Sequence, residues 1–268
     1  MGFIIGLVSG AFGGLVGLGG GVIMVPLMVG ILKMSQHKAH GTSLMALVFT
    51  GIAGAVTYAS KGSVDITASL LLASTAIFTA RAGARYANIL PEWKLKKSFG
   101  GFLLFVTLIL LLKPYIPHIA GPTTGWLTII ILLFTGGFTG FLSGMMGIGG
   151  GALMVAAMVL LTGLPQYTAQ GSSLLAMVPA GVIGAFTHWR LGNVNTSILP
   201  GLIPGIIIGT FLGSSFAYTL SEGVLRTIFA AVMIWIGVKY LRTPAVKAVP
   251  EGVKSLPNVG ELSNKNAK

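Results

Sequence analysis

The sequence contains seven long apolar stretches, and several of them approach the roughly 20 residues that a membrane-spanning helix needs. They are residues 41–59, 63–80, 98–112, 126–146, 171–187, 196–220 and 224–241. Only 8% of the residues are charged, whereas soluble domains carry about 25%. The chain is therefore predicted to be an all-α polytopic membrane protein without a hidden soluble domain.

Two glycine-rich segments interrupt this apolar pattern: GLVGLGGGVIMVP at residues 14–26 and GMMGIGGGALMVA at residues 144–156. Each glycine weakens a helix by roughly 1 kcal/mol relative to alanine, so these glycines are expected to end one helix before the next begins. About eleven apolar residues follow each glycine run, at 22–32 and 152–162, and as a helix they would rise only about 16 Å, half of a bilayer core. We call residues 17–21 and 147–151 the first and second glycine knots, and expect each to form part of a broken or re-entrant element.

The two knots belong to an internal duplication, in which the two halves of the chain align at a constant offset. Residues 10–64 match residues 140–194 at 23 of 55 positions without a gap. Each half contains an apolar run, a knot, a short apolar run and three longer helices, or about five membrane segments. We expect a first transmembrane repeat over 1–113, a linker over 114–125, a second repeat over 126–242 and a disordered cytoplasmic tail over 243–268.

The distribution of Lys and Arg predicts how the repeats lie in the membrane, because these residues accumulate on the cytoplasmic side. If each half crosses an odd number of times, the halves are inverted and 14 of the 17 Lys and Arg residues share one side. If the halves are parallel, the count is eight against nine. We therefore predict inverted repeats with both termini cytoplasmic, an arrangement typical of secondary transporters. This bias also explains the net charge of +12 without nucleic-acid binding.

The knots and two polar clusters supply the candidate substrate-binding residues. A helix that begins after a knot directs free N–H groups and the positive end of its dipole outward, which suits a small anion. Close helix packing through glycine is the alternative interpretation. The clusters His40-Gly41-Thr42-Ser43 and Gln170-Gly171-Ser172-Ser173 open apolar stretches, where they would either cap a helix or contact substrate. The candidates are Gly19, Gly20, Gly21, His40, Thr42, Ser43, Gly149, Gly150, Gly151, Gln170, Ser172 and Ser173.

A third cluster, His188-Trp189-Arg190, is expected to end a helix on the predicted cytoplasmic side. Trp189 and Arg190 would anchor that helix at the membrane interface, and a vestibule that attracts anions is the alternative. Arg81 and Arg85 are expected at a similar helix end, where they would extend toward the membrane surface.

Other kinds of chemistry have few residues to support them. The acidic residues all fall in predicted loops or in the tail, which disfavours a cation channel, a divalent-metal carrier and a carboxylate-based proton pump. The four histidines lack metal-ligand spacing, no nucleophile–base pair indicates an enzyme, and neither knot continues into a nucleotide-binding motif. We therefore expect no metal and no cofactor. Neutral donors and helix dipoles remain, and they suit an anion.

The duplicated motif also carries a resemblance to a known family. The G-x-x-G-x-G-G-G segments at 14–21 and 144–151, with Val25-Pro26 after the first, and the A-x-G-[TS]-S-L stretches at 39–44 and 169–174 resemble the TauE/SafE sulfite-exporter family of membrane permeases. The resemblance covers roughly residues 2–242. It implies a secondary transporter in the cell inner membrane that exports a sulfur-containing anion, such as sulfite or an organosulfonate.

Two alternatives stay open at this point: a permease for another small organic anion, and a membrane scaffold that moves no substrate. The expected partners are a small anion and the lipid bilayer. The residues give no indication of oligomeric state.

Overall fold

The structure is a computed structural model that describes residues 1–112, 125–219 and 221–242. In these ranges the chain is helical and contains no strand. Most of the expected linker and the whole expected tail lie outside the described residues. The helices are α1 (Gly2–Val16), α2 (Gly21–Gly30), α3 (Gln36–Ala59), α4 (Ile66–Ile89), α5 (Glu92–Leu112), α6 (Trp126–Met146), α7 (Gly151–Leu161), α8 (Gln166–Arg190), η1 (Thr196–Ile198), α9 (Leu199–Phe216), η2 (Ala217–Thr219) and α10 (Glu222–Leu241).

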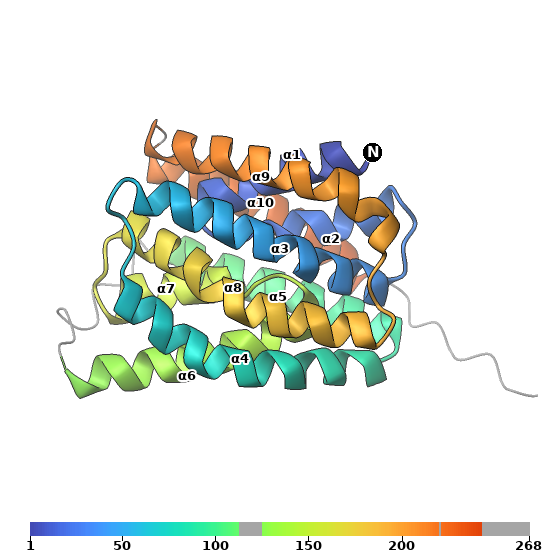
Figure 1. Ribbon diagram of the computed structural model, residues 1–268, viewed down its shortest axis with the longest axis horizontal. Coiled ribbons are helices and arrows are strands. Elements are labelled where there is room, and N and C mark those ends of the chain that lie inside the picture. The colour runs from blue at the N-terminus through green and yellow to red at the C-terminus, as the bar shows by residue number, and fades with distance from the viewer. Residues whose placement is uncertain (113–124, 220, 243–268) are drawn as a thin grey trace, which may run out of the picture.

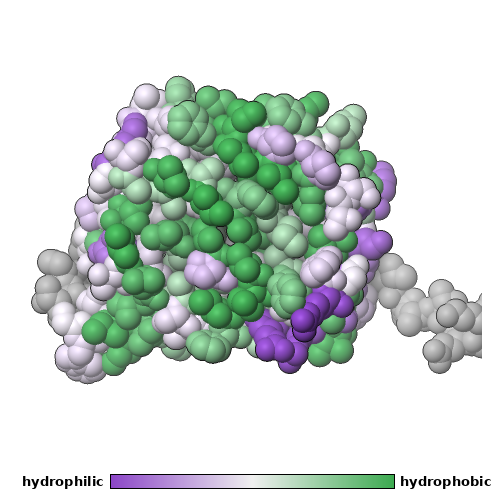
Figure 2. All heavy atoms as spheres, in the orientation of Figure 1, coloured by the Kyte–Doolittle hydropathy of each residue, from purple (hydrophilic) through white to green (hydrophobic). Residues whose placement is uncertain are grey.

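Among the described residues, five helical units are long and apolar enough to cross a membrane, namely α3, α4, α6, α8 and the continuous unit Thr196–Thr219 made of η1, α9 and η2. Helices α1, α2 and α7 are apolar but shorter. The face of the molecule shown in Figure 2 is correspondingly rich in apolar side chains. This arrangement confirms the prediction of an all-α polytopic membrane protein.

The helices keep the constant offset seen in the sequence. Helices α2, α3 and α5 correspond to α7, α8 and α10, and the first three begin at Gly21, Gln36 and Glu92 while the others begin at the aligned Gly151, Gln166 and Glu222. Their packing also repeats, since α1 packs against α9 as α6 packs against α4. Helices α3 and α8 pack against each other across the middle of the bundle, and α5 packs against α10 (Figure 1).

Helices α3 and α8 run in opposite directions, because the start of each meets the end of the other. The Oγ1 atom of Thr42, near the start of α3, accepts a hydrogen bond of 2.8 Å from the N–H of Asn195, which follows α8. The equivalent Ser172 of α8 accepts one of 2.8 Å from the N–H of Asp65, which follows α3. Such exchanged contacts agree with inverted repeats, and both the inversion and its placement relative to a membrane stay predictions.

The chain turns back on itself at each knot. Gly20, at the start of α2, lies against the backbone of Ser9 in α1, and Gly150, at the start of α7, lies against Thr139 in α6. The short helices α2 and α7 therefore fold back beside the helices that precede them. Each half thus opens with a helical hairpin that has a glycine knot at its tip.

Glycines outside the knots bring helices into close contact. A Cβ atom on Gly10 of α1 would lie 2.5 Å from the carbonyl oxygen of Ile206 in α9. A Cβ atom on Gly140 of α6 would lie 2.5 Å from the Cα of Ala76 in α4. Gly10 and Gly140 are equivalent positions, and each allows two helices to pack closely, as small residues do in membranes.

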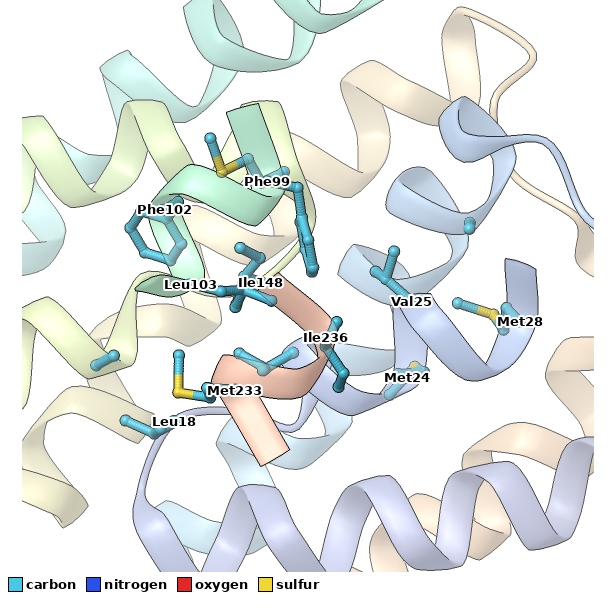
Figure 3. Packing of buried hydrophobic residues seen from close by; sticks show 14 of the residues in the cluster. Leu18, Met24, Val25, Met28, Phe99, Phe102, Leu103, Ile148, Met233 and Ile236 are labelled. Carbon is cyan, nitrogen blue, oxygen red and sulfur yellow. The ribbon is translucent and has the colours of Figure 1, made fainter. Parts of the chain in front are cut away.

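The apolar core extends from the knots to α5 and α10. Ile148 of the second knot lies in one cluster with Leu103 of α5 and with Met233 and Ile236 of α10 (Figure 3). All four side chains are at least 95% buried. Helices α5 and α10 thus hold the tip of the second hairpin inside the bundle.

Basic residues gather at the end of the bundle where α3 begins and where α4 and α8 end. At this end His37 Nε2 donates to the carbonyl oxygens of Ala87 and Leu90, and Asn193 Nδ2 donates to Asn88 Oδ1 over 2.7 Å. The sequence places Lys38, Arg85, Lys94, Lys96, Lys97 and Arg190 on the segments that meet here. By the positive-inside rule this end is the predicted cytoplasmic side.

Candidate functional site

The backbone of each knot adopts a conformation that favours glycine. Gly17, Gly19 and Gly20 have φ angles of 72°, 85° and 74°. This left-handed region is open to glycine and costly for residues with a Cβ atom. The equivalent angles in the second knot are 66°, 92° and 67° at Gly147, Gly149 and Gly150. The sharp reversal of the chain between two helices therefore requires glycine at these positions, whether or not a ligand binds there.

The two knots lie directly against each other. A Cβ atom on Gly21 would lie 2.5 Å from the carbonyl oxygen of Gly147, and one on Gly151 would lie 2.8 Å from the carbonyl oxygen of Gly17. Contacts below 3.0 Å essentially never occur for real Cβ atoms. The two helix interruptions, one from each half of the chain, therefore meet backbone to backbone at one place.

Two serines from the predicted clusters tie each knot to a helix of the other half. Ser43 Oγ of α3 donates to the carbonyl oxygen of Gly147 over 2.8 Å, and Ser173 Oγ of α8 donates to that of Gly17 over 2.8 Å. Both serines are fully buried. These bonds satisfy carbonyl groups that the interrupted helices α6 and α1 leave without an intrahelical donor.

The predicted His40 and Gln170 also contact the knots. His40 donates through Nδ1 to the carbonyl oxygen of Met146, at the end of α6, and its Nε2 lies 2.9 Å from Gln36 Nε2. This pairing fixes the neutral tautomer in which Nε2 accepts. Gln170 packs against Gly17, and its Oε1 accepts a hydrogen bond of 3.0 Å from the hydroxyl of Tyr58.

The hydroxyls of Thr42 and Ser172 form hydrogen bonds with loops and not with the knots. Their hydroxyls accept the loop N–H groups described above, so they hold the connections that follow α8 and α3. The interpretation of these clusters as helix caps is wrong, because α3 begins at Gln36 and α8 at Gln166, one turn earlier. Ser35 caps α3 instead, accepting from the N–H of Lys38. The sequence misled because the apolar run begins after the helix does.

An apolar pair closes the space in front of the knots. Leu47 of α3 and Met177 of α8 are equivalent residues, and both are at least 97% buried. A Cβ atom on Gly149 would lie 2.6 Å from the Met177 sulfur and 2.9 Å from Leu47 Cδ2. Gly19 faces the same two side chains. We call Leu47 and Met177 the apolar plug, since one pair of side chains covers both knots.

The start of each short helix offers unused hydrogen-bond donors. Within the described part of the chain, the hydrogen bonds around the knots include none donated by the backbone N–H groups of Gly19, Gly20, Gly149 or Gly150. These donors lie at the N-termini of α2 and α7, where the helix dipole is positive.

The charged groups near the two ends of the bundle leave this region uncharged. Asp65 caps α4 by accepting from the N–H of Ala68, and Glu92 pairs with His37 and Lys96 at the start of α5. The described residues also contain no group of three or more His, Cys, Asp or Glu that could hold a metal ion. A neutral, donor-rich site of this kind is chemically suited to an anion.

These features define a polytopic helical membrane protein whose halves each contribute a glycine-tipped hairpin, and the two hairpin tips meet inside the bundle. The model of the family described as "Sulfite exporter TauE/SafE" matches residues 2–240, and the chain belongs to this family. It is accordingly a membrane transporter of that family.

Curated relatives are similar over most of their length. The probable membrane transporter protein YunE of Bacillus subtilis (strain 168) is 28% identical over 256 residues, which cover 87% of this chain and 94% of the relative. A probable membrane transporter protein of Xylella fastidiosa (strain 9a5c) is 30% identical over 237 residues, covering 87% and 90%. The protein YdhB of Bacillus subtilis is 24% identical over 229 residues, covering 84% and 91%. No solved structure matches the chain.

Several residues of this region were not expected from the sequence. Leu47 and Met177 were not distinguished from other core residues, although the alignment of the two halves relates them. Tyr58 and His188 are likewise equivalent, and they bond the carbonyl oxygens of Gly14 and Gly144, which are also equivalent, at 3.0 Å and 2.8 Å. His188 is fully buried, although it directly precedes the expected interfacial anchors Trp189 and Arg190. Comparing the two halves already relates Tyr58 to His188, but their contacts with Gly14 and Gly144 were not expected, and the same comparison would have paired Leu47 with Met177.

Proposed function

We propose that this membrane transporter carries a small sulfur-containing anion, such as sulfite or an organosulfonate, through a site between the two glycine knots. The family name supports the substrate class, and the chemistry of the region supports an anion. The observation that carries the proposal is that both knots, with their unused N–H donors, face the same pair of side chains.

The N-termini of α2 and α7 supply the attraction. Each presents backbone donors and a positive helix dipole, and glycine lets an oxyanion approach the main chain closely. Because the donors are neutral, the site binds an anion without having to compensate a buried charge when it is empty. Because the site carries no fixed positive charge, the bound anion can also be released.

The apolar plug accounts for closure of the pathway. With Leu47 and Met177 packed on the knots, an anion has no room in front of Gly19 and Gly149. We infer alternating access in which α3 and α8, which carry the plug, move relative to the hairpin tips and expose the site to one side at a time. Export fits the family name, and the direction is set by the gradients across the membrane.

A thermal-shift screen of the purified protein in detergent tests the proposal. Sulfite, thiosulfate, sulfate, taurine, sulfoacetate and acetate are compared at matched ionic strength. We expect stabilisation by one or two sulfur anions and none by acetate. An equal response to all six would contradict the substrate class.

Two variants of equal side-chain length test the location of the site. Met177→Glu places a carboxylate between the two helix N-termini, where it would compete with the anion, and is expected to abolish the response to sulfite. Met177→Gln adds a polar group without charge and is expected to retain the response. An undiminished sulfite response in Met177→Glu would place the anion elsewhere.

A further inference from the structure

Three arginines line one groove between α4 and α8, away from the knots. Arg81 and Arg85 of α4 and Arg190 of α8 surround a space of about 270 Å³, together with apolar side chains that include Ile183 and Phe186. Strongly hydrophilic residues are visible on this face toward the end where α4 and α8 finish (Figure 2). This is a concentration of positive charge on an otherwise apolar surface.

No carboxylate balances these charges in the described part of the chain. There Glu92 lies 3.9 Å from His37 and 4.0 Å from Lys96, and neither contact involves an arginine. Asp65 lies at the opposite end of α4. Arg190 lies over the ring of Phe186, with 4.4 Å between the guanidinium carbon and the ring centroid. Its charge therefore makes a cation–π contact with an aromatic ring and no ion pair with a carboxylate among the described residues.

The duplication shows that the fold does not require this charge. The positions equivalent to Arg81, Arg85 and Arg190 in the other half are Phe211, Ser215 and Ser60. All three arginines are exposed in the structure, so they do not hold the two helices together by burial. The arginines are a feature that one half has and the other lacks, which favours a role other than folding.

The depth of the groove limits what can bind there. Arg81 precedes the end of α4 at Ile89 by eight residues, or about 12 Å of helix. Phe78, one turn earlier on the same face, is 78% exposed, and this position suits contact with lipid. Arginine at such a depth extends toward the membrane surface while its stem stays in apolar surroundings. A ligand of this groove therefore needs an anionic head and an apolar tail.

We propose that Arg81, Arg85 and Arg190 bind the phosphate of an anionic phospholipid on the predicted cytoplasmic side. The guanidinium groups donate to the phosphate oxygens, since a planar fork of N–H donors matches an oxyanion. The acyl chains lie along the apolar face that holds Phe78 and Phe186. Basic pockets between membrane helices on this side are suited to such headgroups. The site is separate from the proposed transport site and does not depend on its substrate.

Thermal unfolding in detergent, with defined lipid added, tests this assignment. Phosphatidylglycerol and phosphatidylcholine with identical acyl chains are compared, and inorganic phosphate is a third arm. The variant replaces Arg81, Arg85 and Arg190 with Gln, and the matched control replaces Lys94, Lys96 and Lys97 with Gln. Both variants lose three positive charges at the same end of the bundle, so a diffuse electrostatic effect would alter them equally.

We expect phosphatidylglycerol to raise the unfolding temperature of the wild type and of the lysine variant by several degrees more than phosphatidylcholine does. The arginine variant is expected to lose this difference. Equal responses in the two variants would overturn the proposal, and so would an equal effect of inorganic phosphate on the wild type. If the arginine variant does not fold, native mass spectrometry of wild-type protein that fails to retain phosphatidylglycerol over phosphatidylcholine would overturn it as well.

Discussion

Replacing Gly21 by alanine tests whether the two knots truly meet backbone to backbone. The new Cβ atom would lie 2.5 Å from the carbonyl oxygen of Gly147 and 2.8 Å from the Cα of Ile148. Both distances fall short of the 3.0 Å that real Cβ contacts require, and both neighbours are main-chain atoms that no rotamer change can move. The two hairpin tips must therefore separate.

Forcing an extra carbon into a packed interior costs about 1–3 kcal/mol, and we expect about 2 kcal/mol here because the obstacle is backbone. In a chain of this length that corresponds to a fall in the unfolding temperature of about 4–8 °C. Gly151→Ala is expected to have a smaller effect, because its nearest contacts are 2.8 Å and 2.9 Å. Fluorescence-monitored thermal unfolding in detergent measures both.

Gly101→Ala is the matched control, because Gly101 lies inside α5 and a Cβ atom there would meet nothing within 4 Å. Alanine is the better helix former by about 0.5–1 kcal/mol, so this variant is expected to be slightly more stable than the wild type. The two substitutions should thus shift the unfolding temperature in opposite directions. An unchanged or raised value for Gly21→Ala would refute the contact between the knots.

Further predictions concern the bonds and side chains around the knots. Ser43→Ala leaves the buried carbonyl of Gly147 without its donor and is expected to lower the free energy of unfolding by about 1–2 kcal/mol. The control Ser74→Ala, on the exposed surface, should change it by no more than about 0.5 kcal/mol. Unfolding curves that give equal losses would contradict a stabilising bond between Ser43 and Gly147. Tyr58→Phe removes the donor to Gly14 and Gln170 and should lower stability by about 1–3 kcal/mol in the same assay. The double variant Leu47→Ala/Met177→Ala opens the apolar plug and should pass sulfite down its gradient faster than the wild type in proteoliposomes; a rate at or below the wild-type value would contradict a closing role.

Much of the architecture followed from simple features of the sequence. The apolar stretches predicted a helical membrane protein because about 20 apolar residues span a bilayer as a helix, which satisfies its backbone groups internally. The glycine runs predicted interrupted helices, since each glycine weakens a helix and also lets other backbone segments approach closely. The alignment of the two halves predicted that equivalent helices, such as α2 and α7 or α3 and α8, begin at equivalent residues.

The candidate site was harder to predict, because its chemistry is carried by the main chain and by ordinary core residues. Ser43 and Ser173 each reach the knot of the other half, and only the tertiary structure brings them there. Leu47 and Met177 look like any core side chain until their shared contact with both knots is seen. Thr42 and Ser172 were expected to cap a helix or contact substrate, but their hydroxyls accept hydrogen bonds from the loops that follow α8 and α3.

Transport between the knots requires the apolar plug to move, and thiol labelling at Met177 tests this most directly. The chain contains no cysteine, so the single variant Met177→Cys carries the only thiol. Vesicles containing this variant are treated with a membrane-impermeant maleimide from either side, with and without saturating sulfite. We predict labelling from each side in turn, slowed by sulfite. A thiol that stays unreactive from both sides while the same vesicles transport sulfite would contradict a pathway between the knots.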